Sequence, residues 1–198
     1  MNFSAKVFGK FTMMLSLALL ASLLLASPTE AVSTRNSAYN PCKPRGGAFW
    51  PTEMNISGVG TVKVIGLRKA RNGVPRTPAI SNSGKRMVAW SSSHAAPGAS
   101  RGNVLMNAHT YPDGSALGNQ MLKSTGVGSL IMVSGPYGNM CYRVTKRVVY
   151  NPSGKKLAKQ YYNQAGYNQL AIVVCSGKRI GKGRWTKRTV WYASPSLY

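Results

Sequence analysis

Short apolar runs alternate with clusters of glycine, proline and asparagine from Ile56 to the end of the chain. Apolar runs of this kind, bounded by turn-forming residues, are typical of β-strands. The pattern predicts strands at 59–67, 87–90, 103–108, 129–134, 140–150, 170–175 and 189–193. Apolar residues at near-helical spacing also predict short helices at 115–124 and 155–164.

The order of these elements indicates one mainly β domain, because neither an internal repeat nor a second hydrophobic core is visible. Glycine-rich clusters at 98–102, 135–139 and 177–183 are expected to form turns. A closed or nearly closed barrel is the simplest arrangement, since closure removes exposed strand edges. Residues 32–55 lack periodicity and predict a surface lead-in, which leaves 56–198 as the domain.

The N-terminal segment 1–31 has the composition of an export signal. Lys6 and Lys10 precede an apolar run at 11–26, and Thr29-Glu30-Ala31 offers a small-x-small cleavage site. A membrane-spanning helix needs about 20 apolar residues, so the run is short for a permanent anchor. We expect export with cleavage after Ala31, and retention as a membrane anchor is the alternative.

The charge balance excludes several kinds of chemistry. The chain has 26 lysines and arginines against 3 acidic residues, a formal net charge of +23. The acids are Glu30, Glu53 and Asp113, so a pair of catalytic carboxylates or an acidic calcium or magnesium site is not expected. A Cys-His pair needs no carboxylate, which favours thiol chemistry.

The positive charge itself allows several partners. It suits an anionic membrane or wall surface, and it would also suit nucleic acid or simply improve solubility. One possible thiolate and two scattered histidines do not give the ligand spacing of a zinc site. We expect no metal and no cofactor.

The cysteine count is odd, with Cys42, Cys141 and Cys175. In an exported chain, the simplest partition is a disulfide between Cys42 and Cys141 and a free, working Cys175. The alternative is three reduced cysteines that are mostly buried. The sequence alone leaves both arrangements open.

Two strand ends carry the candidate groups for acyl transfer. The apolar run 170–174 is followed by Cys175 and then by Ser176-Gly177, which would place the sulfur at an accessible rim. His109 ends the run 104–108, whereas His94 lies in a loop without periodicity. We expect His109 to be the proton-transfer partner, although a strand-end cysteine and a lone histidine can both be structural.

An acyl-transfer site also needs a group that stabilises the oxyanion. Arg188 opens the last predicted strand and could direct two N–H donors at the developing charge. Arg184 has the same side-chain parity if that strand extends backwards, so it is the alternate candidate.

In chain order, His109 at one strand end, Cys175 at a later strand end and Arg188 in the strand after that resemble the sortases. The segment 107–119 reads Asn-Ala-His-Thr-Tyr-Pro-Asp-Gly-Ser-Ala-Leu-Gly-Asn and is most similar to actinobacterial class F sortases. The segment 185–193 resembles the arginine strand of the family. The resemblance covers about residues 56–195, although a common Thr-Leu-x-Thr-Cys run is replaced by Ala-Ile-Val-Val-Cys at 171–175.

The resemblance implies an eight-stranded β-barrel and a cysteine transpeptidase. The implied substrate is a surface protein with a sorting signal of the Leu-Pro-x-Thr-Gly type, cut between Thr and Gly through a thioacyl intermediate. The implied acceptor is an amine, for example of a peptidoglycan precursor or a pilin, and no nucleic acid is expected. His109 would move protons and Arg188 would stabilise the oxyanion, at the outer face of the cell membrane or in the wall.

Two other functions are compatible with parts of the sequence. An L,D-transpeptidase is also an exported thiol enzyme, but it carries an arginine almost directly after its cysteine, where this chain has Ser176-Gly177. A basic β-domain without enzymatic activity, binding wall polymer or nucleic acid, would explain the charge but would leave Cys175 without a role.

Overall fold

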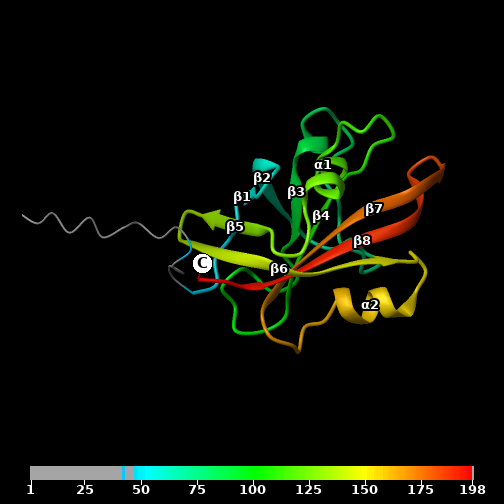
Figure 1. Cartoon of the computed structure of the whole chain (residues 1–198). Coiled ribbons are helices and arrows are strands. Elements are labelled where there is room, and N and C mark those ends of the chain that lie inside the picture. The colour runs from blue at the N-terminus through cyan, green and yellow to red at the C-terminus, as the bar shows by residue number, and fades with distance from the viewer. Residues whose placement is uncertain (1–41, 43–46, 198) are drawn as a thin grey trace, which may run out of the picture. The chain divides into compact units, whose positions relative to one another are not determined.

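The computed structural model describes Cys42 and residues 47–197. Its strands close into a barrel in the order β1-β2-β3-β4-β7-β8-β6-β5 (Figure 1). Pairs β2–β3 and β4–β7 are parallel, and the other neighbours are antiparallel. The strands are β1 (Glu53–Ile56), β2 (Gly60–Leu67), β3 (Val88–Ser91), β4 (Asn103–Ala108), β5 (Leu130–Gly135), β6 (Gly138–Tyr150), β7 (Gln169–Gly181) and β8 (Arg184–Pro195).

The helices are short, and they lie in the connections between strands. They are the 3₁₀ helix η1 (Gly84–Arg86), α1 (Leu117–Ser124) and α2 (Lys155–Tyr161). The prediction of a mainly β, closed eight-stranded barrel with short helices is therefore confirmed. The structure differs at Glu53–Ile56, which forms β1 within the expected lead-in, because only Met54 and Ile56 alternate inward and the run is too short to stand out.

Side chains alternate between the two faces of the barrel wall, and β7 shows this clearly. Leu170, Ile172 and Val174 point into the main core, and each is at most 2% exposed. Ala171 and Val173 point outward, where a second apolar cluster forms. Position 175 has the outward parity, so the wall presents its cysteine to the outer face.

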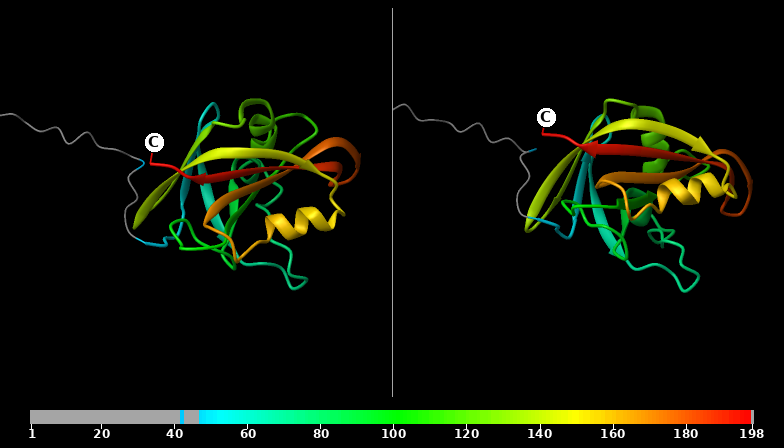
Figure 2. Two further views of the ribbon diagram at one scale, coloured as in Figure 1. Left: turned by 60° about the horizontal axis from the view of Figure 1, so that its bottom comes forward. Right: turned by 90° about the horizontal axis from the view of Figure 1, so that it is seen from below.

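Helix α2 covers this outer cluster, beside β7 and β8 (Figure 2). Tyr161 packs there, and its hydroxyl donates a hydrogen bond of 2.9 Å to the Met106 carbonyl. The Asn103 side chain donates to the carbonyls of Gln160 and Tyr161 at 2.8 and 2.9 Å. These bonds satisfy the end of the helix and fix it beside β4.

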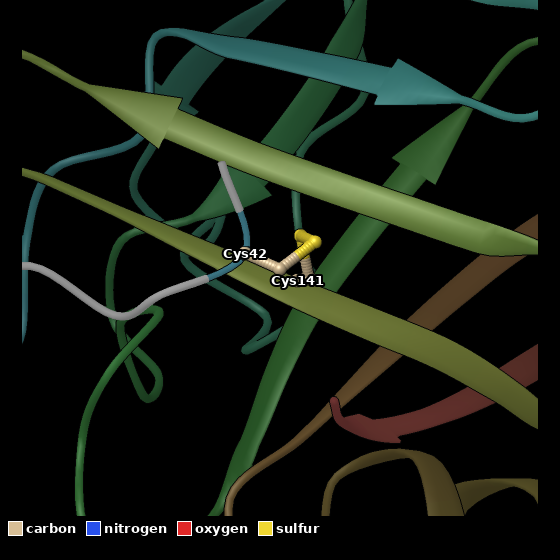
Figure 3. The surroundings of a disulfide bond; sticks show 2 residues. All are labelled: Cys42 and Cys141. Carbon is tan, nitrogen blue, oxygen red and sulfur yellow. A yellow bond between two sulfur atoms is a disulfide. The ribbon is translucent and has the colours of Figure 1, made fainter. Parts of the chain in front are cut away.

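The structure joins Cys42 to Cys141 of β6 by a disulfide and leaves Cys175 free (Figure 3). The bonded residues are 99 positions apart in the sequence, and both are buried. The bond thus ties the start of the described chain to the barrel wall.

Within the part of the chain that the structure describes, no helix has the length and apolar character needed to cross a membrane. The apolar run at 11–26 and the expected cleavage point at Ala31 lie outside the described residues. Export and processing therefore stay predictions.

Candidate active site

A groove of about 980 Å³ brings together Cys175, His109 and Arg188. Its walls come from the end of β4, the outer face of β7 and β8, helix α2 and the connection between β2 and β3. Besides these three residues, members of each wall line it: Val74, Thr77, Asn107, Leu157, Tyr161, Val173 and Trp185. Three side chains that are distant in the sequence thus share one concave surface.

Cys175 lies within β7 and not at its end, which corrects the sequence interpretation. The strand continues to Gly181, with register irregularities after Ser176. Gly177 has φ 78°, and the Lys178 N–H donates to the Thr186 side chain at 2.9 Å. Ser176-Gly177 therefore forms a bulge, where the sequence predicted a turn. The sulfur lies in the groove because the Cys175 side chain points to the outer face of β7, and not because the strand ends there.

Arg188 is the direct cross-strand partner of Cys175. Its Nη1 donates to the carbonyl oxygens of Trp185 at 3.2 Å and Lys187 at 2.9 Å, which holds the side chain along the groove wall. Nε and Nη2 lie outside these bonds, and N–H donors of this kind can stabilise an oxyanion.

Arg184 does not line the groove. It pairs with Gly181 next to the turn of the β7–β8 hairpin, and a Cβ on Gly181 would lie 3.3 Å from its Nε. The parity argument that made Arg184 an alternate did not account for its distance along the strand. The geometry favours Arg188.

His109 is positioned by three neighbours. The Gly118 N–H donates to its carbonyl at 2.8 Å, and a Cβ on Gly118 would lie only 2.5 Å from that oxygen. Its Nε2 is 2.7 Å from the Pro78 carbonyl oxygen, and its ring centroid is 5.7 Å from that of Tyr111. Because a carbonyl can only accept, Nε2 carries the proton, and Nδ1 is the acceptor of the neutral ring.

A hydrogen bond that the sequence did not predict connects the segment after β4 to β7. Thr110, which is buried, donates from Oγ1 to the Cys175 carbonyl at 2.7 Å. On the next strand, Thr189 donates to the Ser176 hydroxyl at 2.9 Å. The sequence shows a threonine directly after His109, but it does not show that this threonine bonds to a residue 65 positions away.

The environment of Cys175 acts on its acidity in two directions. Burial raises the pKa of the thiol, and the Arg188 guanidinium lowers it in part. Burial is the larger effect, so the thiol form is favoured near neutral pH. A thiolate therefore has to be produced by proton transfer, and an imidazole in the same groove can accept that proton.

The second histidine lies away from the groove. His94 does not line the groove; its Nδ1 is bonded to the Ser91 hydroxyl at 2.9 Å, and burial, then Lys69, lowers its pKa. Among the described residues, no three His, Cys, Asp or Glu side chains come together to hold a metal ion.

No protein-family model matches the chain, and no curated protein matches its sequence. Solved sortases have a similar fold. Sortase C1 of Streptococcus agalactiae, in complex with MTSET, gives a TM-score of 0.55 at 15% identity, over 75% of this chain and 70% of that one. Streptococcus suis sortase C1 gives 0.55 at 16%, over 75% and 73%. Listeria monocytogenes sortase A gives 0.52 at 14%, over 73% and 85%. At these identities the likeness shows the shared fold.

Proposed function

We propose that this chain is a sortase-type cysteine transpeptidase. One observation carries the proposal: the free thiol of Cys175 lies across from Arg188 and in the same groove as His109. A nucleophile, a proton carrier and an oxyanion donor are the groups that acyl transfer through a thioester needs. The sortase fold of the barrel adds support from an independent source.

In the first half-reaction, the Cys175 thiol transfers its proton to His109, and the sulfur attacks the carbonyl carbon of a substrate threonine. The C–N bond to the following glycine breaks, and His109 gives its proton to the departing amine. In the second half-reaction, an acceptor amine attacks the thioester carbon and loses a proton to His109, the C–S bond breaks, and His109 returns the proton to the Cys175 sulfur. Arg188 stabilises the negative oxygen in both tetrahedral intermediates.

The substrate that we propose is a surface protein with a sorting signal of the Leu-Pro-x-Thr-Gly type, cut between Thr and Gly. The acceptor is an amine of a wall precursor or a pilin. The likeness of residues 107–119 to class F sortases is the reason to place the chain in that class. Its site of action would be the outer face of the membrane or the wall, consistent with the predicted export signal.

Hydroxylamine-dependent cleavage of a fluorogenic Leu-Pro-x-Thr-Gly peptide by residues 32–198 tests the proposal. We expect a peptide hydroxamate ending at Thr and a transient thioacyl adduct of matching mass on Cys175. Cys175→Ala should abolish both products. Absence of any adduct, with peptides that vary the first and third positions, would contradict the proposed activity.

The charge of the chain supports a second, non-enzymatic candidate. Four cations, Lys155, Arg179, Lys182 and Arg188, line the groove without an acidic side chain among the lining residues. A domain that only binds anionic polymer would keep its salt-dependent binding in Cys175→Ala and would form no thioacyl adduct.

A further inference from the structure

The connection between β2 and β3 lies against the groove, over residues 74–80, and extends on the side of α2 (Figure 2). We call residues 74–80 the groove segment. Val74, Pro75, Thr77 and Ile80 line the groove, whereas Arg76 does not. Val74 and Ile80 remain 50% and 83% exposed, whereas Pro75 and Pro78 are buried. None of the four belongs to either hydrophobic core cluster.

The groove segment is bonded through its main chain to the side chains of the proposed site. Asn107 donates from Nδ2 to the Arg76 carbonyl at 3.0 Å. His109 donates from Nε2 to the Pro78 carbonyl at 2.7 Å. Hydrogen bonds to the main chain of a bound segment are a common source of affinity in peptide recognition.

Turns fix both ends of the groove segment. Its middle is bonded to the barrel by the hydrogen bonds from Asn107 and His109. The Ala70 N–H donates to the Val74 carbonyl at 2.9 Å. At the other end, Ser81 accepts from the Gly84 N–H through its hydroxyl at 3.0 Å. Displacement of the middle would break its two bonds to the barrel and expose Pro75 and Pro78, but it would break no bond of the barrel sheet.

The sequence of the groove segment matches its position. Val74-Pro75-Arg76-Thr77 has an aliphatic residue, a proline, a variable residue and a threonine, in the order of the proposed sorting signal. The first, second and fourth of these residues line the groove, and the variable one does not. The residue after Thr77 is Pro78, whose nitrogen carries no hydrogen, whereas the proposed signal has glycine there.

We propose that residues 74–78, which form one wall of the groove, cover part of it as a built-in substitute for the substrate peptide, and that a sorting signal binds by displacing them. This inference rests on the proposed function and adds two statements to it. The groove accepts a peptide of the type aliphatic-Pro-x-Thr, and Asn107 and His109 bind its main-chain carbonyls. The resting site is therefore partly covered by the chain itself.

One buried atom indicates why a substrate can compete with the groove segment. Asn107 is 5% exposed, and its Oδ1 has no hydrogen-bond partner among the described residues. Its Nδ2 is already used, so this oxygen can only be satisfied by a donor such as a peptide N–H. A substrate that offers one gains a bond that the groove segment does not make.

Alkylation of Cys175 by iodoacetamide tests the inference without requiring catalysis. Residues 75–80 are replaced by Gly-Ser-Gly-Ser-Gly-Ser, and Arg76→Ala serves as the control within the same segment. If the segment covers the groove for nine-tenths of the time, the replacement raises the alkylation rate about tenfold. Arg76→Ala should alkylate at the original rate. An unchanged rate in the folded replacement variant would overturn the inference.

A peptide added in trans tests the mimicry itself. Val-Pro-Arg-Thr-Pro, blocked at both ends and at millimolar concentration, should slow alkylation of the replacement variant, whereas the same residues in scrambled order should not. Equal effects of the two peptides would show that the segment only covers the groove and does not resemble its ligand.

Hydrogen exchange in Cys175→Ala covers the case in which the replacement variant does not fold. With a saturating Leu-Pro-x-Thr-Gly peptide, the amides of residues 76, 77, 79 and 80 should exchange faster as the segment leaves. Unchanged exchange there, with protection of β7, would overturn the inference. If no sorting peptide binds or is cleaved but the replacement variant alkylates faster, the self-covered groove stands and the sortase function fails.

Discussion

Thr110 donates a hydrogen bond of 2.7 Å from its side chain to the main-chain carbonyl of Cys175. The residue that follows His109 is thereby attached to the residue that carries the sulfur. The parallel pairing of β4 with β7 ends at Ala108 and Val174. The Thr110 side chain then holds the two chain segments together just beyond that point. We expect this bond, together with the β4–β7 pairing, to set the relative position of the imidazole and the thiol.

Substitution of Thr110 should reduce turnover more than substrate binding. Thr110→Val keeps the shape but leaves the Cys175 carbonyl without its donor, a loss of about 1–3 kcal/mol at a buried site. If this cost falls on the transition state, kcat decreases about tenfold with little change in KM. Thr110→Ser should recover most of the activity. Steady-state kinetics of peptide hydroxylaminolysis distinguish these outcomes, and equal kcat in all three proteins would contradict the role.

Removal of Arg188 should raise the pKa of the Cys175 thiol further, because the guanidinium opposes the effect of burial. The pH at which the alkylation rate of Cys175 reaches half of its maximum should therefore be higher in Arg188→Gln than in the original chain. Its kcat/KM should also fall about 10²–10³-fold if the side chain binds the oxyanion.

Arg184→Gln is the matched control for Arg188, since it removes a nearby charge that does not line the groove. Its alkylation profile and kinetics should stay close to those of the original chain. A larger effect at position 184 than at 188 would reverse the assignment.

Loss of the Cys42–Cys141 disulfide should destabilise the fold without removing the free thiol of Cys175. The bond closes a long loop, since its ends are 99 positions apart, so Cys42→Ser with Cys141→Ser should lower the free energy of unfolding by about 2–5 kcal/mol. Urea unfolding measures this difference, and thiol titration should still find Cys175. Equal stability of the oxidised and double-serine proteins would contradict the expectation.

His94 should make the stability depend on pH in a defined direction. Burial lowers its folded-state pKa, so the unfolded chain binds a proton more readily. The contribution of neutral His94 is complete above its ordinary pKa of about 6.5 and is lost as the pH falls towards the lowered value. Urea unfolding at pH 8, 6.5 and 5 should show this loss, and His94→Asn should reduce it. An identical pH dependence in both proteins would exclude His94.

Much of the fold was predictable because its strands are uninterrupted apolar runs. Strand β4 (Asn103–Ala108) has the predicted bounds, since its apolar run ends at Ala108 and polar and turn-forming residues follow. Gln169–Gly181 extends six residues beyond the predicted end at Cys175, because a bulge at Ser176-Gly177 has the same composition as a turn. Local composition cannot distinguish them, as the difference lies in the pairing with β8.

The candidate site was predictable in its reactive residues and not in its supporting contacts. The sequence indicated Cys175, His109 and Arg188 through order and parity, and their catalytic roles stay predictions. It did not indicate Thr110, Asn107 or the groove segment. Their contacts are to main-chain oxygens of residues about 30 to 65 positions away, and main-chain acceptors leave no mark on composition.

The alternation along β7 has a consequence for any systematic substitution library of this strand. At 170, 172 and 174, polar replacements should lower the yield of folded protein. At 173 and 175, which line the groove, the same replacements should leave expression largely intact and alter which peptides are processed, or stop processing altogether. Ala171 points outward but is buried in the cluster under α2, so polar replacements there should also lower the yield. A screen that records abundance and product separately would therefore show abundance losses at 170–172 and 174, and product changes at 173 and 175.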